Sequence, residues 1–318
     1  MRLLNFSKRL LLASCFTLLS LPCAAIQTDT DKTIHELYHI LNSKPTSDMA
    51  SRLEIISAQF LGKPYLLGAL GEGPTGDYDQ FPLYRTDAFD CETYVDTVLA
   101  LALANNPSQF KHCINQVRYR EGHVSFTDRN HFPCLDWNQN NQQQGFVKDI
   151  TATIRNHHNQ AVVEFADALV NKPSWYAHMS TKNIRLNNAS PREQIKRLQS
   201  LKHEGNKLDS SVSTIAYIPL SVLFDKSGNA NQYLFNQIPN AAIVEIIRPN
   251  WDLTKEIGTH LNVSHLGFVF WKKGLLLFRQ ASSARNSVVD VPLIDYLRDA
   301  QKSPTIRGIN IQVVVPTS

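Results

Sequence analysis

The chain has 318 residues, of which 43% are apolar, 9% aromatic and 19% charged. This composition is that of a globular protein and excludes a disordered, collagen-like or coiled-coil chain. The net charge is +4, but three basic residues (Arg2, Lys8 and Arg9) and no acidic residue lie in the first 25. Without those 25 residues 29 basic residues face 28 acidic ones, and a charge so near zero argues against a nucleic-acid-binding protein.

Residues 1–25 have the pattern of a secretory signal peptide. A basic start is followed by an apolar run, Leu10 to Leu21, and by small residues up to Ala25 that suit cleavage. The run is too short to span a bilayer and no later stretch is longer, so we expect no integral membrane segment after signal removal. An uncleaved N-terminal anchor is the alternative. We expect a bacterial periplasmic or secreted protein with a single domain over residues 26–318, of which residues 26–62 form an N-terminal helical part.

The first half of the chain is predicted to be mainly helical. The clearest helix runs from Asp90 to Asn105, because Asp90 suits the N-cap position and Pro107 follows the end. Apolar spacing and composition predict further helices at 31–41, 47–61, 107–116 and 191–203, an ordered Gly- and Pro-rich loop at 62–83, strands with loops at 116–137, and a polar loop at 138–144.

The C-terminal third is predicted to be mainly strands. The segments with this character are 241–247, 263–271, 275–280 and 308–315, with a short helix at 292–300. Lys272-Lys273-Gly274 indicates a hairpin between two of them. Helices followed by antiparallel strands define the α+β class.

Three cysteines remain after the predicted leader: Cys91, Cys113 and Cys134. In an oxidising compartment an odd number suggests one pair and one free thiol. One hypothesis is that Cys113 and Cys134 pair, closing a loop that contributes about 3 kcal/mol and leaving Cys91 free; the alternative is that they do not pair.

Cys91, His265 and Gln280 are the candidate catalytic residues. Cys91 lies in the first turn of the predicted helix, where unpaired N–H groups and the helix dipole favour a thiolate; a buried structural cysteine is the alternative. His265 begins an apolar strand, and the hairpin pairs it with Gln280 or with Ser282, depending on which two residues form the loop. In both registers His265 and Gln280 face the same side, so the Gln280 amide can fix the imidazole tautomer; a solvent-facing Gln280 is the alternative.

Four segments in the same order carry a family resemblance: DAFDCETYVDTVLALAL, VRYREGHVSFTDRNHFPCLDW, VSHLGFVFW and QASSARNSVVDVPLIDYL. Together they resemble the DUF1460 family of the NlpC/P60 superfamily of papain-like cell-wall peptidases and amidases. The resemblance implies a papain-like core, with a nucleophile helix packed on an antiparallel sheet, plus N-terminal helices and large insertions. It also implies an N-acetylmuramoyl-L-alanine amidase that acts on peptidoglycan fragments (muropeptides) without a metal or other cofactor.

The resemblance also assigns roles by position. Cys91 matches the family's nucleophile and His265 its base, and Tyr65 is implied to shape the site. The third catalytic position lies in a His-Ala-Ser-Ser motif, which here reads Gln280-Ala281-Ser282-Ser283. Gln280 can still accept from a ring N–H, so activity is expected to survive, although a weakened site is the alternative.

Several side chains are candidates for substrate contacts. Arginine can clamp peptide carboxylates, and Tyr or Trp rings can lie against a sugar face. The best matches to the family pattern are Tyr119, Arg120, Arg129 and Trp137, with Glu72 and Ser283 as further candidates. The alternative is an ordinary strand and loop with buried aromatic side chains.

Other functions compete with the amidase. A zinc amidase or a serine hydrolase is disfavoured because the chain has no H-E-x-x-H and no G-x-S-x-G. An endopeptidase acting within the stem peptide, and a catalytically retired muropeptide-binding protein, remain as alternatives.

Overall fold

The computed structural model describes residues 23–43 and 48–316. Its longer helices are α1 (Cys23–Ser43), α2 (Met49–Ala58), α3 (Cys91–Leu103), α4 (Pro107–Arg118), α5 (Asn138–Gln143), α6 (Lys172–Ala177), α7 (Pro191–Gly205) and α10 (Leu293–Ala300), with the short α8 (Leu220–Leu223) and α9 (Gln232–Phe235) between them. Its strands are β1 (Val147–Asp149), β2 (Glu164–Asn171), β3 (Ser210–Pro219), β4 (Ile243–Leu253), β5 (Thr259–Lys272), β6 (Leu275–Ser282), β7 (Ser287–Pro292) and β8 (Gly308–Val314).

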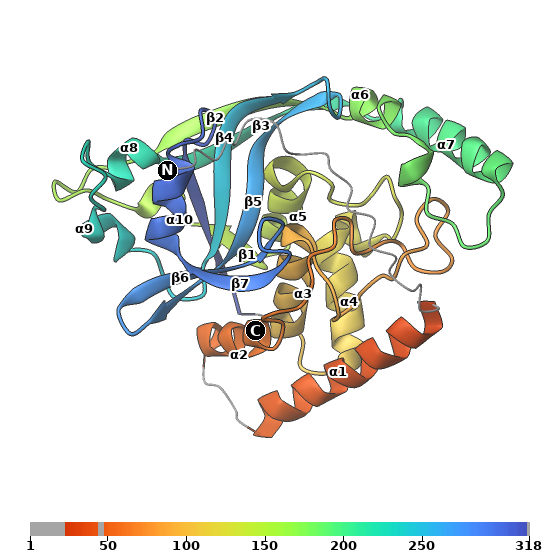
Figure 1. Cartoon of the computed structure of the whole chain (residues 1–318), viewed down its shortest axis with the longest axis horizontal. Helices are drawn as coiled ribbons and strands as arrows, with labels where there is room; N and C mark the ends of the chain where they lie inside the picture. The colour runs from red at the N-terminus through yellow and green to blue at the C-terminus, as the bar shows by residue number, and fades with distance from the viewer. Residues whose placement is uncertain (1–22, 44–47, 317–318) are drawn as a thin grey trace, which may run out of the picture.

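The strands form one sheet in the order β2-β3-β8-β4-β5-β6-β7, with β1 added against β8, and each pairing is antiparallel. In Figure 1 α3 and α4 lie on one side of this sheet, and α8, α9 and α10 lie on the other. Successive residues of a strand point to opposite faces, so Ile243 joins the apolar core around α3 while Val244 joins the core that contains Leu293 and Leu297 of α10. The fold is therefore α+β, as predicted, with both faces of the central strands covered.

Most predicted elements are confirmed, but α1 begins eight residues before the predicted helix at 31–41 and β4 continues six residues past the predicted strand at 241–247. The β5–β6 hairpin turns at Lys273-Gly274, because Lys272 pairs with Leu275. This is the second of the two registers considered. Both loop residues have positive φ, 49° and 82°, which is the conformation a tight hairpin turn of this type requires.

Two predictions for the middle of the chain are wrong. Residues 116–137 form no strand; they contain the end of α4, an isolated bridge between Tyr119 and Arg129, and a helical turn at Pro133–Trp137. Residues 138–144 are mostly helix α5 instead of a polar loop. Asn141 has no exposed surface, and its Nδ2 donates to the Val117 and Trp137 carbonyls. Its donors are therefore satisfied inside the protein rather than by water, whereas its Oδ1 has no partner among the described residues.

The predicted disulfide is also wrong. Cys113 and Cys134 are both free thiols. Cys113 packs against the core around α3, whereas Cys134 is buried in a separate cluster with Phe132 and Ile215. Sequence separation alone does not place two thiols at bonding distance.

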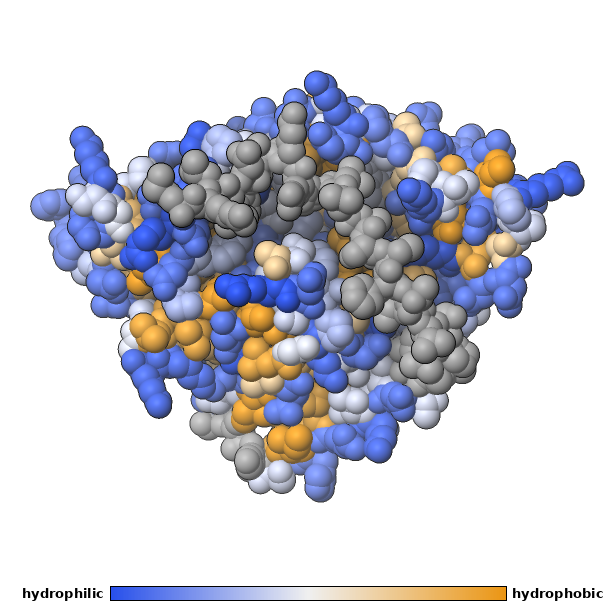
Figure 2. Space-filling view, viewed as in Figure 1, coloured by the Kyte–Doolittle hydropathy of each residue, from blue (hydrophilic) through white to orange (hydrophobic). Residues whose placement is uncertain are grey.

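Residues 1–22 of the predicted leader lie outside the described residues, and its last three residues begin α1. Within residues 23–43 and 48–316, no helix combines the length and apolar character needed to cross a bilayer. Figure 2 shows hydrophilic residues over much of the visible face, with apolar surface gathered in its lower half.

A buried polar network lies at the centre of the sheet. Glu245 on β4 has no exposed surface. Its Oε2 accepts from Asn138 Nδ2 at 3.0 Å, and Gln312 Nε2 donates to Asn138 Oδ1 at 2.7 Å. Burial raises the pKa of Glu245 to about 8, and nearby Asp149 adds to the increase. The carboxyl is therefore neutral in the folded protein at neutral pH.

This raised pKa predicts a pH-dependent stability. In the unfolded chain Glu245 ionises near its ordinary pKa. The stability that the neutral carboxyl contributes is therefore complete below that ordinary pKa and is lost as pH rises through about 8. The free energy of unfolding falls by up to about 1.4 kcal/mol per pH unit over this range. We expect Glu245→Gln to flatten the fall in melting temperature between pH 5 and 8. The exposed Glu256→Gln is the control, and equal pH slopes for both variants and the wild type would contradict the prediction.

Candidate active site

The start of α3 is fixed by Asp90. Its Oδ1 accepts from the Thr93 backbone N–H at 2.9 Å, and the Asp90 N–H donates back to Thr93 Oγ1 at 3.0 Å, which completes a capping box. The other carboxylate oxygen accepts from the Gly68 N–H at 2.7 Å. One side chain thus caps the helix and attaches the loop at 62–83 to it, with Cys91 as the first helical residue.

The Cys91 thiol lies against β5. The backbone N–H of Leu266 donates to its sulfur, which favours the thiolate, but burial has the larger effect and raises the thiol pKa well above its ordinary value. The neighbouring Asp90 and Glu92 raise it further. The thiolate expected from the helix dipole is therefore not the resting state, because burial and two adjacent acids outweigh the helix start.

His265 and Gln280 meet across the β5–β6 hairpin, as predicted. His265 Nε2 is hydrogen-bonded to Gln280 Oε1. Since an amide oxygen only accepts, Nε2 carries the proton and Nδ1 is left as the acceptor. Gly267 allows this close approach: a Cβ there would lie 2.6 Å from the Arg279 carbonyl oxygen and 3.1 Å from Gln280 Cβ. Burial lowers the pKa of His265 to about 4, partly offset by the Gln280 hydrogen bond and by Asp90.

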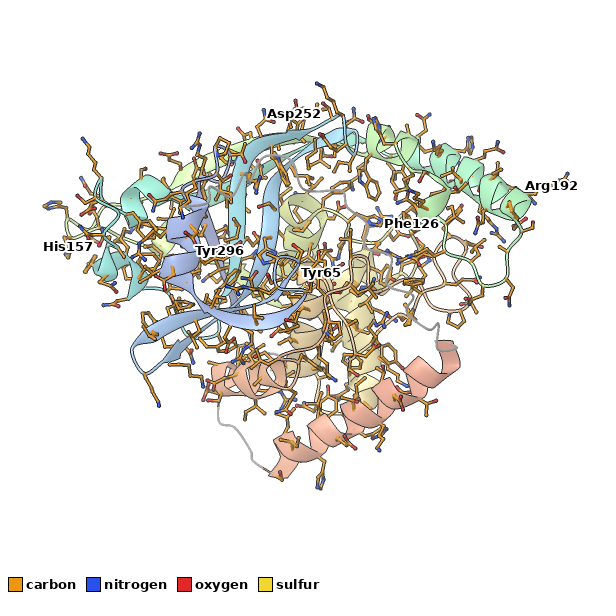
Figure 3. All side chains as sticks on the ribbon, viewed as in Figure 1. Tyr65, Phe126, His157, Arg192, Asp252 and Tyr296 are labelled. Carbon is orange, nitrogen blue, oxygen red and sulfur yellow. The ribbon has the colours of Figure 1, made fainter. Side chains whose placement is uncertain are left out.

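Two tyrosines flank Cys91. Tyr65 comes from the loop that bridges to Phe89, and Tyr296 comes from α10. Burial raises the pKa of both phenols, to about 12 for Tyr296, and the nearby Cys91 adds to each increase. Figure 3 shows both near the middle of the molecule, far from His157 and Arg192 at its two ends. The Tyr296 ring also stacks on His265, with centroids 6.4 Å apart.

Cys91, His265, Gln280 and Tyr65 are thus brought into one region. Leu266, whose N–H binds the Cys91 sulfur, directly follows His265, and Asp90, which precedes Cys91, influences the His265 pKa. The arrangement offers a thiol and a neutral imidazole held in one tautomer.

Glu72 and Arg129 form an internal ion-pair network instead of an open subsite. Arg129 Nη2 pairs with Glu72 and, at 3.0 Å, with Asp79, which also pairs with Arg185. The Glu72 side chain is 3% exposed and that of Arg129 14%. This network joins the loop at 62–83 to the segment after α4.

Tyr119 and Trp137 have no exposed surface. The Tyr119 hydroxyl donates to the Gly71 carbonyl at 2.9 Å, and Trp137 Nε1 donates to Asp96 of α3 at 2.7 Å. In this structure both rings support the site from inside and offer a sugar no face, so the placement agrees with the alternative of buried aromatic side chains.

Arg120 and Ser283 are exposed. Arg120 pairs with Asp128. Ser283 lies in the turn between β6 and β7, where the preceding residue, Ser282, accepts from the Arg285 N–H at 3.2 Å. Ser283 is thus near Gln280 in the chain but does not cap the turn.

The sequence analysis missed Tyr296 and Arg248. Tyr296 lies in a short amphipathic helix whose polar residues resemble ordinary surface positions. Arg248 comes directly after the predicted strand at 241–247, at the start of an irregular stretch of β4 that ends at Trp251. Among residues 23–43 and 48–316, no cluster of three His, Cys, Asp or Glu side chains is arranged to hold a metal ion.

The fold and these residues define an α+β protein with a thiol at a helix start and an imidazole on an inner strand of an antiparallel sheet. The chain belongs to the AmiA-like family, described as N-acetylmuramoyl-L-alanine amidase-like, whose model matches residues 55–306. The predicted DUF1460 resemblance agrees with one solved structure, protein LPG0564 of Legionella pneumophila, which is assigned to DUF1460. The two chains are 53% identical with a TM-score of 0.90, covering 93% of this chain and 97% of the other.

More distant structures share the fold. An N-acetylmuramoyl-L-alanine amidase of Bacteroides uniformis is 22% identical with a TM-score of 0.59, covering 84% of this chain and 98% of that one. A putative xylanase of Bacteroides fragilis is also 22% identical, with a TM-score of 0.54 over 80% of this chain and 98% of that one. Among curated proteins none matches this chain.

The lowered pKa of His265 predicts a distinct titration. We expect the ring signals of His265 in NMR spectra to titrate with a midpoint near pH 4, instead of about 6.5 for an ordinary histidine, because burial disfavours the imidazolium. The spectrum of His265→Gln identifies the signal. A midpoint above pH 6 in the folded protein would contradict the buried, neutral imidazole.

Proposed function

We propose that this protein is a cysteine-dependent N-acetylmuramoyl-L-alanine amidase that cleaves muropeptides, with a papain-like core of the NlpC/P60 type. The observation that carries the proposal is the His265–Gln280 hydrogen bond beside the start of the Cys91 helix. It gives the base one tautomer, with Nδ1 open, next to a thiol at a helix N-terminus. The amidase-like family of the chain supports the choice of bond.

The reaction begins with attack of the Cys91 sulfur on the amide carbonyl between the lactyl group of N-acetylmuramic acid and L-alanine. His265 Nδ1 takes the thiol proton as the C–S bond forms, and then gives it to the leaving alanine nitrogen. The C–N bond breaks and leaves a thioester. Water, deprotonated by His265, hydrolyses that thioester and restores the thiol.

The neutral resting pair shapes the first step. With the Cys91 pKa raised and that of His265 lowered, proton transfer accompanies attack instead of preceding it. Gln280 holds the ring through Nε2–H and stabilises the imidazolium that forms, which is the role of the third residue in such triads.

The negatively charged oxygen that forms when Cys91 attacks the carbonyl requires hydrogen-bond donors beside Cys91. The Cys91 backbone N–H at the start of α3 is one such donor. We assign the second to the Tyr65 hydroxyl, since the backbone N–H groups of Tyr65 and Leu66 already donate to the Asn286 and Phe89 carbonyls at 3.0 and 2.9 Å.

The leader pattern supports a periplasmic or secreted location, where muropeptides are met. A stem-peptide endopeptidase and a retired binding protein remain the competing functions, and the experiments below separate them from the amidase.

The first test is mass spectrometry of a defined muramoyl tripeptide incubated with the mature protein. Wild type should release the intact tripeptide from the sugar, and Cys91→Ala should abolish release because no other group forms the thioester. Cys113→Ala, which removes a half-buried thiol from α4, is the matched control and should remain active.

Two results contradict the amidase. Cleavage within the peptide would make the protein an endopeptidase. No cleavage with measurable binding would make it a retired enzyme.

Gln280 provides a second test. Gln280→Ala should reduce kcat about 10- to 100-fold, as loss of an orienting partner generally does, while KM changes little. Gln280→His, which restores the residue of the family motif, should retain more activity than Gln280→Ala. A fully active Gln280→Ala protein would show that the imidazole is oriented by something else.

A further inference from the structure

Arg248 is a cation beside the proposed active site, and it has no acidic partner among the residues that the structure describes. It lies on β4 just after Ile246, which pairs with His265 of β5. Its Nη1 donates to Thr305 Oγ1 at 2.9 Å, and its guanidinium carbon lies 4.4 Å from the centre of the Trp251 ring. Within the described residues its Nε is buried without a hydrogen-bond partner.

Arg248 is half-buried and has spare donors. Burial lowers the pKa of Arg248, and the opposing influence comes from the Tyr296 phenol rather than from a carboxylate. Arg279 and Arg129 differ, because Arg279 pairs with Asp290 at 2.7 Å and Arg129 pairs with Glu72 and Asp79. Arg52 is also half-buried without a carboxylate partner among the described residues, but it donates to the Ala102 and Ala104 carbonyls. The guanidinium of Arg248 therefore keeps donors that an anion supplied from outside can accept from.

Tyr296 links Arg248 to the reacting groups. Its phenol is influenced by both Cys91 and Arg248, and its ring stacks on His265. Arg248, with Trp251 beneath it, therefore lies on the Tyr296 side of the site.

Resting on the proposed function, we propose that Arg248 binds a carboxylate of the bound peptide, so that the site selects acidic peptide fragments over their amidated forms. The planar guanidinium offers paired N–H donors to a carboxylate, and the Trp251 ring holds it in place. The sequence analysis expected Arg129 to bind a carboxylate of the peptide. Since Arg129 is already neutralised by Glu72 and Asp79, we assign this role to Arg248 instead.

The test compares two probes, a muramoyl tripeptide with free carboxylates and the same compound with those groups converted to carboxamides. Binding is measured by calorimetry on Cys91→Ala protein, so that it does not depend on turnover. We expect the acid to bind more tightly than the carboxamide by about tenfold or more, the usual size of a hydrogen bond to a charged group. Arg248→Met in the same background should remove this preference, and Arg248→Lys should keep part of it.

Arg307→Met is the matched control. Arg307 is exposed, and its backbone N–H donates to the Ile247 carbonyl next to Arg248. Arg307→Met therefore removes the same charge as Arg248→Met from the same end of the sheet. This variant should keep the preference for the acid. Thermal melts of all variants show whether the fold is retained.

The outcomes separate this inference from the proposed amidase. Equal binding of acid and carboxamide, no binding of either, or a preference that survives Arg248→Met in a folded protein would overturn the role of Arg248. If wild type cleaves neither probe but the Arg248-dependent preference is present, the carboxylate site stands and the amidase fails. If both hold, Arg248→Met in the active enzyme should raise KM for the acid with kcat nearly unchanged.

Discussion

The packing of α3 against the sheet is the constraint on which the rest of the structure depends. Its residues from Thr93 to Leu103 are all buried, and Leu266, Phe268 and Phe270 of β5 lie in the same core. A helix buried on every side has no freedom to slide or rotate. Its first residue is therefore held at one point against β5, where the Leu266 N–H meets the Cys91 sulfur.

That burial has an electrostatic consequence. α3 begins with acids at Asp90 and Glu92 and carries Asp96 one turn later, and burial raises the pKa of Asp96 to about 7 even though Arg118 and Trp137 both favour its charged form. The surroundings of Cys91 thus oppose negative charge, which explains a protonated thiol at a position where a helix dipole alone favours the thiolate. A nucleophile of this kind depends on its base, so the orientation of His265 matters more than it would beside a preformed thiolate.

The sequence predicted the features that follow from local rules. The Asp90 cap and the Asn106-Pro107 stop mark α3, and the period of two placed His265 and Gln280 on one side of the hairpin. The predictions from the sequence failed where tertiary contacts determine the local structure. The Asn/Gln run at 138–144 is helical because its buried amides find carbonyl partners, and the rings of Tyr119 and Trp137 are internal because Gly71 and Asp96 accept their polar hydrogens. Arg248 was beyond reach because it lies after the predicted strand at 241–247, where an irregular stretch of β4 begins.

The charges around the proposed site are unequal on its two sides. Acids gather at the start of α3, whereas Arg248, on the side toward α10, has no carboxylate partner among the described residues. On our proposal a peptide carboxylate is attracted to Arg248, which orients the peptide before any contact forms at the reacting carbonyl. Burial and the acids beside Cys91 keep the thiol protonated, while Arg248 directs the substrate, so different charged groups control reactivity and orientation.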